Sequence, residues 1–79
     1  MDKRIGSAII IIQDDQSVSL VNKIISNHAD LILGRQGIPL RDKGINIISL
    51  VIEGDTDEIG SLTGSIGRIK GVKVKSLLA

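Results

Sequence analysis

The sequence predicts an α+β sandwich in which a four-stranded antiparallel sheet carries two helices on one face. Three observations support this fold. First, hydrophobic residues recur with the spacing of strands and helices in the order β-α-β-β-α-β. Second, each half of the chain contains a strand, a capped helix and a strand. Third, a length of 79 residues is enough for one domain. This order is that of the ferredoxin-like split βαβ arrangement. We therefore expect residues 1–79 to form a single domain.

The first strand and the first helix are expected over residues 3–12 and 17–28. The strand is rich in β-branched residues and ends in four isoleucines, Ile9 to Ile12. Because both faces of such a run are apolar, this strand should lie in the centre of the sheet. Apolar residues then recur at helical spacing, and Asp15 or Ser17 could accept a backbone N–H bond where the helix begins.

The second and third strands are expected over residues 31–39 and 45–53. Gly34 and Gly37 interrupt the second strand and indicate a bulge or a close backbone approach. Pro39 lacks an N–H donor, which suits a strand end or a sheet edge. The third strand alternates clearly, and one set of its side chains should share a face: Asn46, Ile48, Leu50 and Ile52.

The second helix and the last strand are expected over residues 55–68 and 72–78. Asp55 and Glu58 stand three residues apart at the start of this helix, which is the spacing of a capping box. Gly71 follows the helix and is expected to end it. The buried face of the helix should consist of Ile59, Leu62, Ile66 and Ile69.

A sheet with helices on one face leaves its other face bare in a monomer. Both faces of the central strands are apolar, so we expect a dimer or tetramer that covers the bare face. The second helix also carries glycines opposite its buried face, and each costs about 1 kcal/mol relative to alanine. Close packing of another chain and a tolerated, poorly packed surface both explain these glycines. The candidate interface residues are Ile10, Ile12, Ile48, Leu50, Gly60 and Gly64.

The candidate ligand-binding residues flank the glycines of the second strand and the turn before the first helix. Arg35, Arg41 and Lys43 lie near these glycines, and exposed backbone N–H groups together with arginines could hold a small anion. Such residues more often form a solvated rim. The candidates are Arg35, Gln36, Gly37, Asp14 and Asp15. We expect a small-molecule effector and no resident cofactor.

Side chains for catalysis and metal binding are scarce in this sequence. His28 is the only histidine and there is no cysteine, too few nitrogen or sulfur ligands for a zinc or nickel site within one chain. His28 is a weak candidate for a metal ligand in an oligomer. The simpler interpretation is that it stands at the end of the helix, where a histidine interacts favourably with the helix dipole. The acidic run 55–58 suits a helix N-terminus. With no nucleophile and base pair in view, we expect no enzyme.

Charge and hydropathy argue against nucleic-acid and membrane partners. Ten basic and nine acidic residues are too balanced for a non-specific nucleic-acid binder, and no aromatic residue is present to stack on bases. The longest apolar run, Ala8 to Ile12, is far shorter than a membrane span, and the N-terminus has no signal-peptide pattern. We expect no direct nucleic-acid binding, no membrane insertion and a cytoplasmic location.

Four stretches of the sequence resemble a known family. They are GRQGIP at 34–39, GINIISLV at 44–51, GDTDEIGSLTG at 54–64 and GVKVKS at 71–76. They are similar to the iron-only hydrogenase system regulators, small ACT-like domains related in fold to the C-terminal domain of nickel-responsive repressors. The resemblance implies a ferredoxin-like fold, homo-oligomers formed through the sheet, and a role in regulating hydrogenase maturation or expression.

Two departures limit what this resemblance implies. The nickel-responsive relatives bind metal through several histidines and a cysteine, whereas this chain has His28 alone. They also carry a separate ribbon-helix-helix domain for DNA, and the residues at hand leave no room for one. The leading hypothesis is therefore a regulatory module that senses a small molecule. The alternative is a structural module that binds another protein without a ligand.

Overall fold

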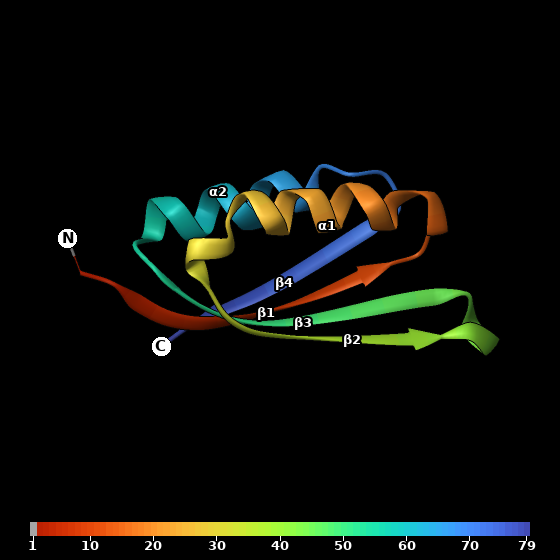
Figure 1. Ribbon diagram of the computed structural model, residues 1–79, viewed down its shortest axis with the longest axis horizontal. Helices are drawn as coiled ribbons and strands as arrows, with labels where there is room; N and C mark the ends of the chain where they lie inside the picture. Colours follow the sequence, from red (N-terminus) through yellow and green to blue (C-terminus); the bar gives the residue numbers. More distant parts are fainter. Residues whose placement is uncertain (1) are drawn as a thin grey trace.

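The structure, a computed structural model, describes residues 2–79 and has the expected order of strands and helices (Figure 1). Short 3₁₀ turns, Asp15–Ser17, Ala29–Leu31 and Arg41–Lys43, connect several of them. Within the described residues, no helix is long and apolar enough to cross a membrane. The strands and helices are β1 (Arg4–Ile12), α1 (Val18–Asn27), β2 (Ile32–Leu40), β3 (Ile45–Gly54), α2 (Thr56–Gly67) and β4 (Val72–Leu78).

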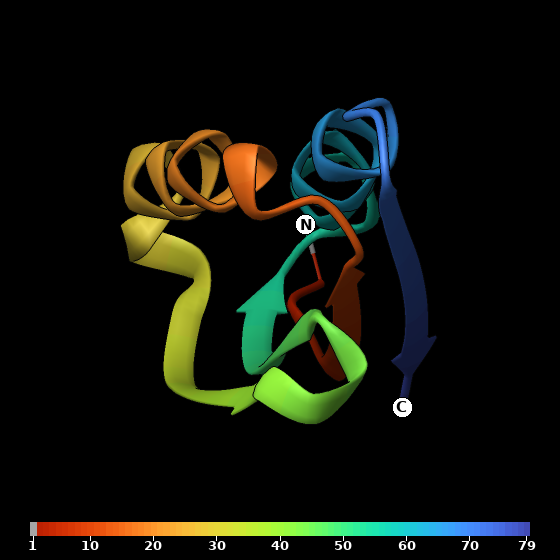
Figure 2. The same cartoon turned by 90° about the vertical axis from the view of Figure 1, so that its right-hand side faces the viewer.

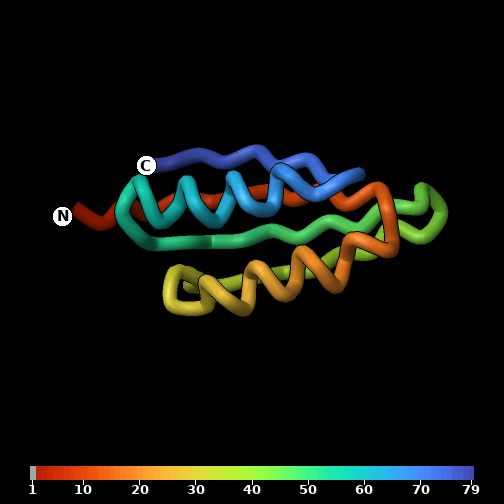
Figure 3. The backbone as a smooth tube through the Cα atoms, turned by 90° about the horizontal axis from the view of Figure 1, so that it is seen from above, coloured from red at the N-terminus to blue at the C-terminus, as the bar shows by residue number. Residues whose placement is uncertain are grey.

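The four strands form one antiparallel sheet in the order β2-β3-β1-β4. Both helices lie on the same face of this sheet, α1 over the β2 side and α2 over the β4 side (Figures 2 and 3). The expected ferredoxin-like α+β fold is therefore confirmed. The isoleucine-rich first strand lies in the interior of the sheet as predicted, and Pro39 lies on an edge strand. The strand register shifts between Ile32 and Gly34, so the bulge indicated by the glycines is present.

The strand register decides which side chains face the helices. Ile10 lies opposite Ile48 of β3 and Val74 of β4. Residues directly opposite each other in antiparallel strands share a face of the sheet. Because Ile10 is buried under the helices, the alternate positions of β1 that share its face also point toward them.

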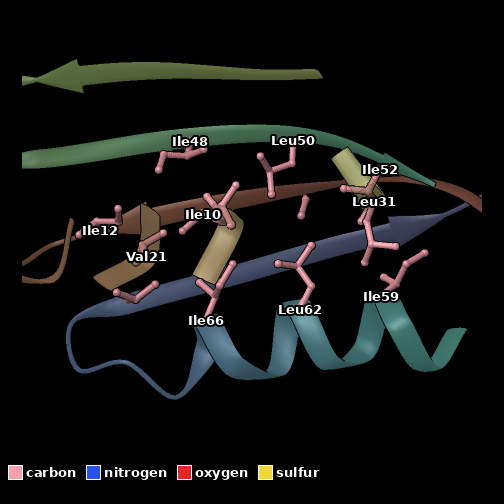
Figure 4. Close-up of a cluster of buried hydrophobic side chains, with 13 residues drawn as sticks. Ile10, Ile12, Val21, Leu31, Ile48, Leu50, Ile52, Ile59, Leu62 and Ile66 are labelled. Atoms are coloured by element: carbon pink, nitrogen blue, oxygen red, sulfur yellow. The ribbon is translucent and has the colours of Figure 1, made fainter. Parts of the chain in front are cut away.

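The hydrophobic core lies between the sheet and the two helices (Figure 4). Burying each of its large aliphatic side chains contributes about 1.5–3 kcal/mol relative to exposure. Strands β1, β3 and β4 and both helices contribute to the core, whereas β2 contributes no fully buried residue. The core residues are Ala8, Ile10, Ile12, Val21, Ile25, Leu31, Ile48, Leu50, Ile52, Ile59, Leu62, Ile66 and Val72.

Four of the predicted interface residues face the helices instead of the bare side of the sheet. Ile10, Ile12, Ile48 and Leu50 are at most 5% exposed within the monomer, so they cannot contact a partner. The choice of face was wrong because isoleucines occupy both sets of alternate positions, and alternation alone does not say which set the helices cover. The opposite face carries Ile5, Ile9, Ile11, Ile47, Val51 and Leu77.

The N-terminus of α2 is closed by the predicted capping box. The Asp55 Oδ1 atom accepts a bond from the backbone N–H of Glu58 at 2.7 Å, and the Glu58 Oε1 atom accepts one from the backbone N–H of Asp55 at 3.0 Å. Past the other end of the helix, Gly71 has a φ of 77°. This left-handed conformation favours glycine, but Gly71 lies in the turn before β4. The helix already ends at Gly67, with Arg68 as its C-cap, so Gly71 does not itself end the helix as predicted.

The N-terminus of α1 is built differently from the prediction. Neither Asp15 nor Ser17 caps it, because a 3₁₀ turn precedes the helix and this turn takes its own cap from Asp14, whose Oδ1 accepts the N–H of Gln16 at 3.0 Å. Ser17 is buried, and its hydroxyl donates to the carbonyl oxygen of Lys70 at 2.9 Å. This bond attaches the start of α1 to the loop before β4.

Candidate functional site

A cleft opens between the N-terminal half of α1 and the β2–β3 hairpin. It consists of two adjoining cavities of about 260 and 200 Å³ that share Pro39 and Asn46. We call the two cavities together the α1–β2 cleft. The larger cavity is lined chiefly by Val18, Asn22, Arg35, Gly37 and Ile48, and the smaller one by Asp15, Arg41 and Gly44.

The cleft exists because β2 places little apolar bulk under α1. The helix-facing positions of β2 are Arg35, Gly37 and Pro39, which lie opposite the helix-facing residues Leu50, Ile48 and Asn46 of β3. Gly37 has no side chain, and a Cβ atom added there would meet no other atom within 4 Å. Thus α1 lies over the β2 side of the sheet (Figure 3), and the edge strand leaves open space beneath the helix.

Two hydrogen bonds fix the polar groups of the cleft. The Nη2 atom of Arg35 donates to Oδ1 of Asn22 on α1 at 2.8 Å. Nδ2 of Asn46 on β3 donates to Oδ1 of Asp15, in the turn before α1, at 3.0 Å. The cleft therefore has the guanidinium of Arg35 in the larger cavity, both Asp15 and Arg41 in the smaller one, and the buried side chain of Ile48 at its floor.

Three of the five predicted ligand-binding residues line this cleft. Arg35 and Gly37 belong to the larger cavity and Asp15 to the smaller one. Gln36 lies opposite Ser49 on the other face of the sheet, because consecutive strand residues point to opposite faces. Asp14 lines neither cavity and caps the 3₁₀ turn instead. That any of these residues binds a ligand stays a prediction.

The structure adds two residues that the sequence reasoning missed, Asn22 and Asn46. Both are amides at positions where the surrounding pattern is apolar. Asn22 follows Val18 by four residues on α1, and Asn46 begins the alternating set that continues with Ile48 on β3. A polar residue that interrupts an apolar stripe was the signal that could have identified each of them.

A third cavity, of about 330 Å³ and separate from the α1–β2 cleft, lies between the C-terminal end of α1 and the N-terminus of α2. Its lining includes His28, Asp30, Asp57 and Glu58. The Nδ1 atom of His28 lies 2.8 Å from the carbonyl oxygen of Ile24, which can only accept, so Nδ1 carries the proton. Across residues 2–79, no three His, Cys, Asp or Glu side chains gather as metal ligands would. A metal role for His28 stays a weak prediction.

The bare side of the sheet, which we call the open face, is largely apolar. Its apolar residues include Ile9 of β1, 41% exposed, and Val51 of β3, 45% exposed. By register, Lys73 and Lys75 of β4 border these residues on one side, and Gln36 of β2 borders them on the other. The open face also carries the exposed Ile38 on its β2 border and the exposed Leu77 on its β4 border, and two serines, Ser7 and Ser49, lie on its central strands. It is thus a largely apolar surface with polar residues among and beside the apolar ones.

Comparison with known proteins places the chain in a family. The model of the TM1266-like family, provisionally described as iron-only hydrogenase system regulator, matches residues 4–76. The solved structure of the uncharacterized protein TM1266 from Thermotoga maritima is 36% identical, covers 98% of each chain and superimposes with a TM-score of 0.93. A search of curated proteins gave no match.

Two solved structures of lower identity share the fold. The ACT domain from GTP pyrophosphokinase of Chlorobium tepidum is 20% identical, with a TM-score of 0.80 over 96% of this chain and 100% of that one. The C-terminal domain of the MgtC protein from Mycobacterium tuberculosis is 12% identical, with a TM-score of 0.75 over 96% of this chain and 87% of that one. Identities this low show the fold alone, which is ACT-like.

Proposed function

This chain belongs to the TM1266-like family of iron-only hydrogenase system regulators, and we propose that it is a small regulatory domain that self-associates and responds to a small molecule. The regulatory part of the proposal is supported by the family's description and by the ACT-like fold. No catalytic step and no direct contact with DNA belong to it. The target within the hydrogenase system would be reached through the assembled oligomer.

Self-association is supported by the open face, the observation on which the proposal chiefly depends. Apolar side chains from β1 and β3 are exposed at its centre, with lysines of β4 along one border. Exposed apolar side chains with polar residues at their edges are typical of a protein interface. A second copy related by a two-fold axis would present the same patch and cover both. Exposed apolar surface of this kind otherwise promotes aggregation.

Ligand response is supported by the position of the α1–β2 cleft relative to the open face. Ile48 lies at the floor of the cleft, and its neighbour Ile47 points to the opposite side of the sheet. On β2, Gly37 and Ile38 are related in the same way. A molecule that shifts β2 or β3 from within the cleft would therefore move side chains of the open face. This connection gives a physical route from binding to assembly.

Sedimentation velocity at micromolar concentration tests self-association. The protein should sediment as a dimer or tetramer. Val51→Glu places a charge on the open face opposite Ser7 and Gly34, which carry no charge, and should shift the protein to monomer, because an unpaired charge is costly to bury. Leu20→Glu is the matched control, since Leu20 is 50% exposed on α1 and away from this face. A monomeric wild-type protein, or equal effects of both substitutions, would contradict the proposal.

Thermal unfolding with amino acids, nucleotides and metal ions tests the ligand response. A ligand that binds only the folded protein raises the Tm of the protein, and above Kd the increase grows with the logarithm of the ligand concentration. Lack of stabilisation across a broad panel would contradict this half of the proposal.

The alternative is an assembly module that uses the open face to hold another protein and has no ligand. A pull-down from native extract separates the two functions. A stable protein partner together with no ligand response supports the alternative. A ligand that changes the sedimentation of the protein supports the regulatory domain.

A further inference from the structure

The larger cavity of the α1–β2 cleft combines one strong anion-binding group with apolar walls. Arg35 reaches into it from β2, and its bond to Asn22 on α1 holds the guanidinium beside the cavity. A guanidinium carries several N–H donors in a planar fork, of which this bond uses one. The remaining wall includes Val18 of α1 and the buried Ile48 of β3.

The space in the cavity is set by the missing side chain of Gly37. With its Cβ absent, β2 leaves about 260 Å³ between Arg35 and the aliphatic wall. Since a water molecule takes about 30 Å³ in the liquid, this volume accommodates roughly eight non-hydrogen atoms. The cavity is thus large enough for a short branched hydrocarbon with one polar head group.

The charges around the cleft select the type of anion. A planar guanidinium fork matches the geometry of a carboxylate and binds it through two parallel hydrogen bonds. At the far end of the cleft Asp15 and Arg41 line the same small cavity, where their opposite charges offset each other. Arg35 is then the one unbalanced charge of the cleft, which matches a monoanion better than a multiply charged anion such as phosphate. A monoanion with an aliphatic body matches both the charges and the apolar wall.

We infer that the effector of this domain is a small aliphatic carboxylate, with its carboxylate on Arg35 and its hydrocarbon part over Gly37 against Val18 and Ile48. This inference rests on the ligand response in the proposed function and adds the chemical class and the binding residues. Asn22 is a positioning residue, because it orients the guanidinium without needing to touch the ligand.

The test is an NMR titration of the ¹⁵N-labelled protein with 3-methylbutanoate. The side-chain amide of Asn22 and the backbone amide of Gly37 should shift and saturate. 3-Methyl-1-butanol, which lacks the charge, and inorganic phosphate, which lacks the hydrocarbon, should each bind at least about tenfold more weakly, as expected for loss of a charged hydrogen-bonding group or of apolar burial. Equal binding of the alcohol or of phosphate overturns the inference.

Substitutions locate the binding. Arg35→Gln should weaken binding of 3-methylbutanoate about tenfold or more, and Arg35→Lys should weaken it several-fold because the charge stays while the fork is lost. Gly37→Val should prevent binding by filling the cavity. Gly67→Val is the control: Gly67 is exposed at the end of α2, lines neither cavity of the cleft and does not belong to the open face, and an added Cβ meets nothing within 4 Å. It should leave the affinity within about twofold.

The outcomes separate this inference from the proposed function. If Arg35→Gln and Gly37→Val remain folded, as judged by circular dichroism, and bind as the wild type does, the inference is wrong. If 3-methylbutanoate does not bind while another compound class stabilises the protein and alters its sedimentation, the carboxylate assignment is wrong and the regulatory function stands. If no compound binds at all, both are wrong.

Discussion

The two edge strands occupy equivalent places in the two halves of the chain but pack differently. Strand β4 directs Val72 and Val74 toward the helices, and Val72 is part of the core. Strand β2 directs Arg35, Gly37 and Pro39 toward them and contributes no core residue. In Figure 4 the labelled core side chains accordingly come from other elements, and β2 lies apart from them.

This difference separates the part of the molecule that stabilises the fold from the part available for binding. The β4 half closes the core and is attached to the start of α1 by the bond between Ser17 and the carbonyl of Lys70. The β2 half keeps its backbone pairing with β3 but leaves the α1–β2 cleft. A binding site at β2 costs little stability, because the strand adds only the partly buried Ile32 at the margin of the core.

The largest expected effect comes from matched leucines on the two helices. Leu62 on α2 is fully buried, whereas Leu20 on α1 is 50% exposed. Leu62→Ala should lower the free energy of unfolding by about 2–5 kcal/mol through lost burial and the cavity left behind. Leu20→Ala should change it by about 0.5 kcal/mol or less. Urea unfolding at one fixed protein concentration measures both, and comparable losses would contradict the assignment of the core.

Matched glycines on β1 and β2 should give effects of opposite sign. A Cβ at Gly6 would lie 2.5 Å from the backbone oxygen of Leu77 on β4, so Gly6→Ala should cost about 1–3 kcal/mol by overpacking. Gly37→Ala meets open space and should stabilise the fold by about 0.4–1 kcal/mol by restricting the unfolded chain. Chemical denaturation tests the pair. Destabilisation by Gly37→Ala would mean that the cleft is more tightly closed than described.

Removing the caps at the starts of the two helices should change the free energy of unfolding by smaller amounts. Asp55→Ala removes the capping box of α2 and should cost about 1 kcal/mol. Asp14→Ala removes only the cap of a three-residue turn and should cost about 0.5 kcal/mol or less. Thermal unfolding followed by circular dichroism gives both values, and an equal loss at Asp14 would show that the turn before α1 is as important as the cap of α2.

The smallest expected effect is that of Arg35→Gln on the ligand-free protein. The bond between Arg35 and Asn22 is exposed, so its loss should change the free energy of unfolding by about 0.5 kcal/mol or less. The same substitution is expected to impair ligand binding strongly. A large loss of stability in the free protein would instead assign Arg35 a structural role.

The sequence by itself determined the order of strands and helices and the capping box at Asp55. These features depend on residues close together in the chain, where hydrophobic period and cap chemistry act locally. It also pointed to Arg35 and Gly37 as candidate ligand residues, and both line the cleft. Neither Asn22 nor Asn46 was selected, because each becomes part of the site only through a partner distant in sequence.

Only the tertiary structure decided which face of the sheet the helices cover and where the cleft lies. Isoleucines fill both sets of alternate positions from Ile9 to Ile12, so the pattern reads the same whichever face is buried. Strand register and the crossing of the helices over the sheet break that symmetry, and they place Ile10 inside and Ile9 outside. Contacts between segments distant in sequence determine the strand register and the position of the helices, so neither can be predicted from a local pattern in the chain.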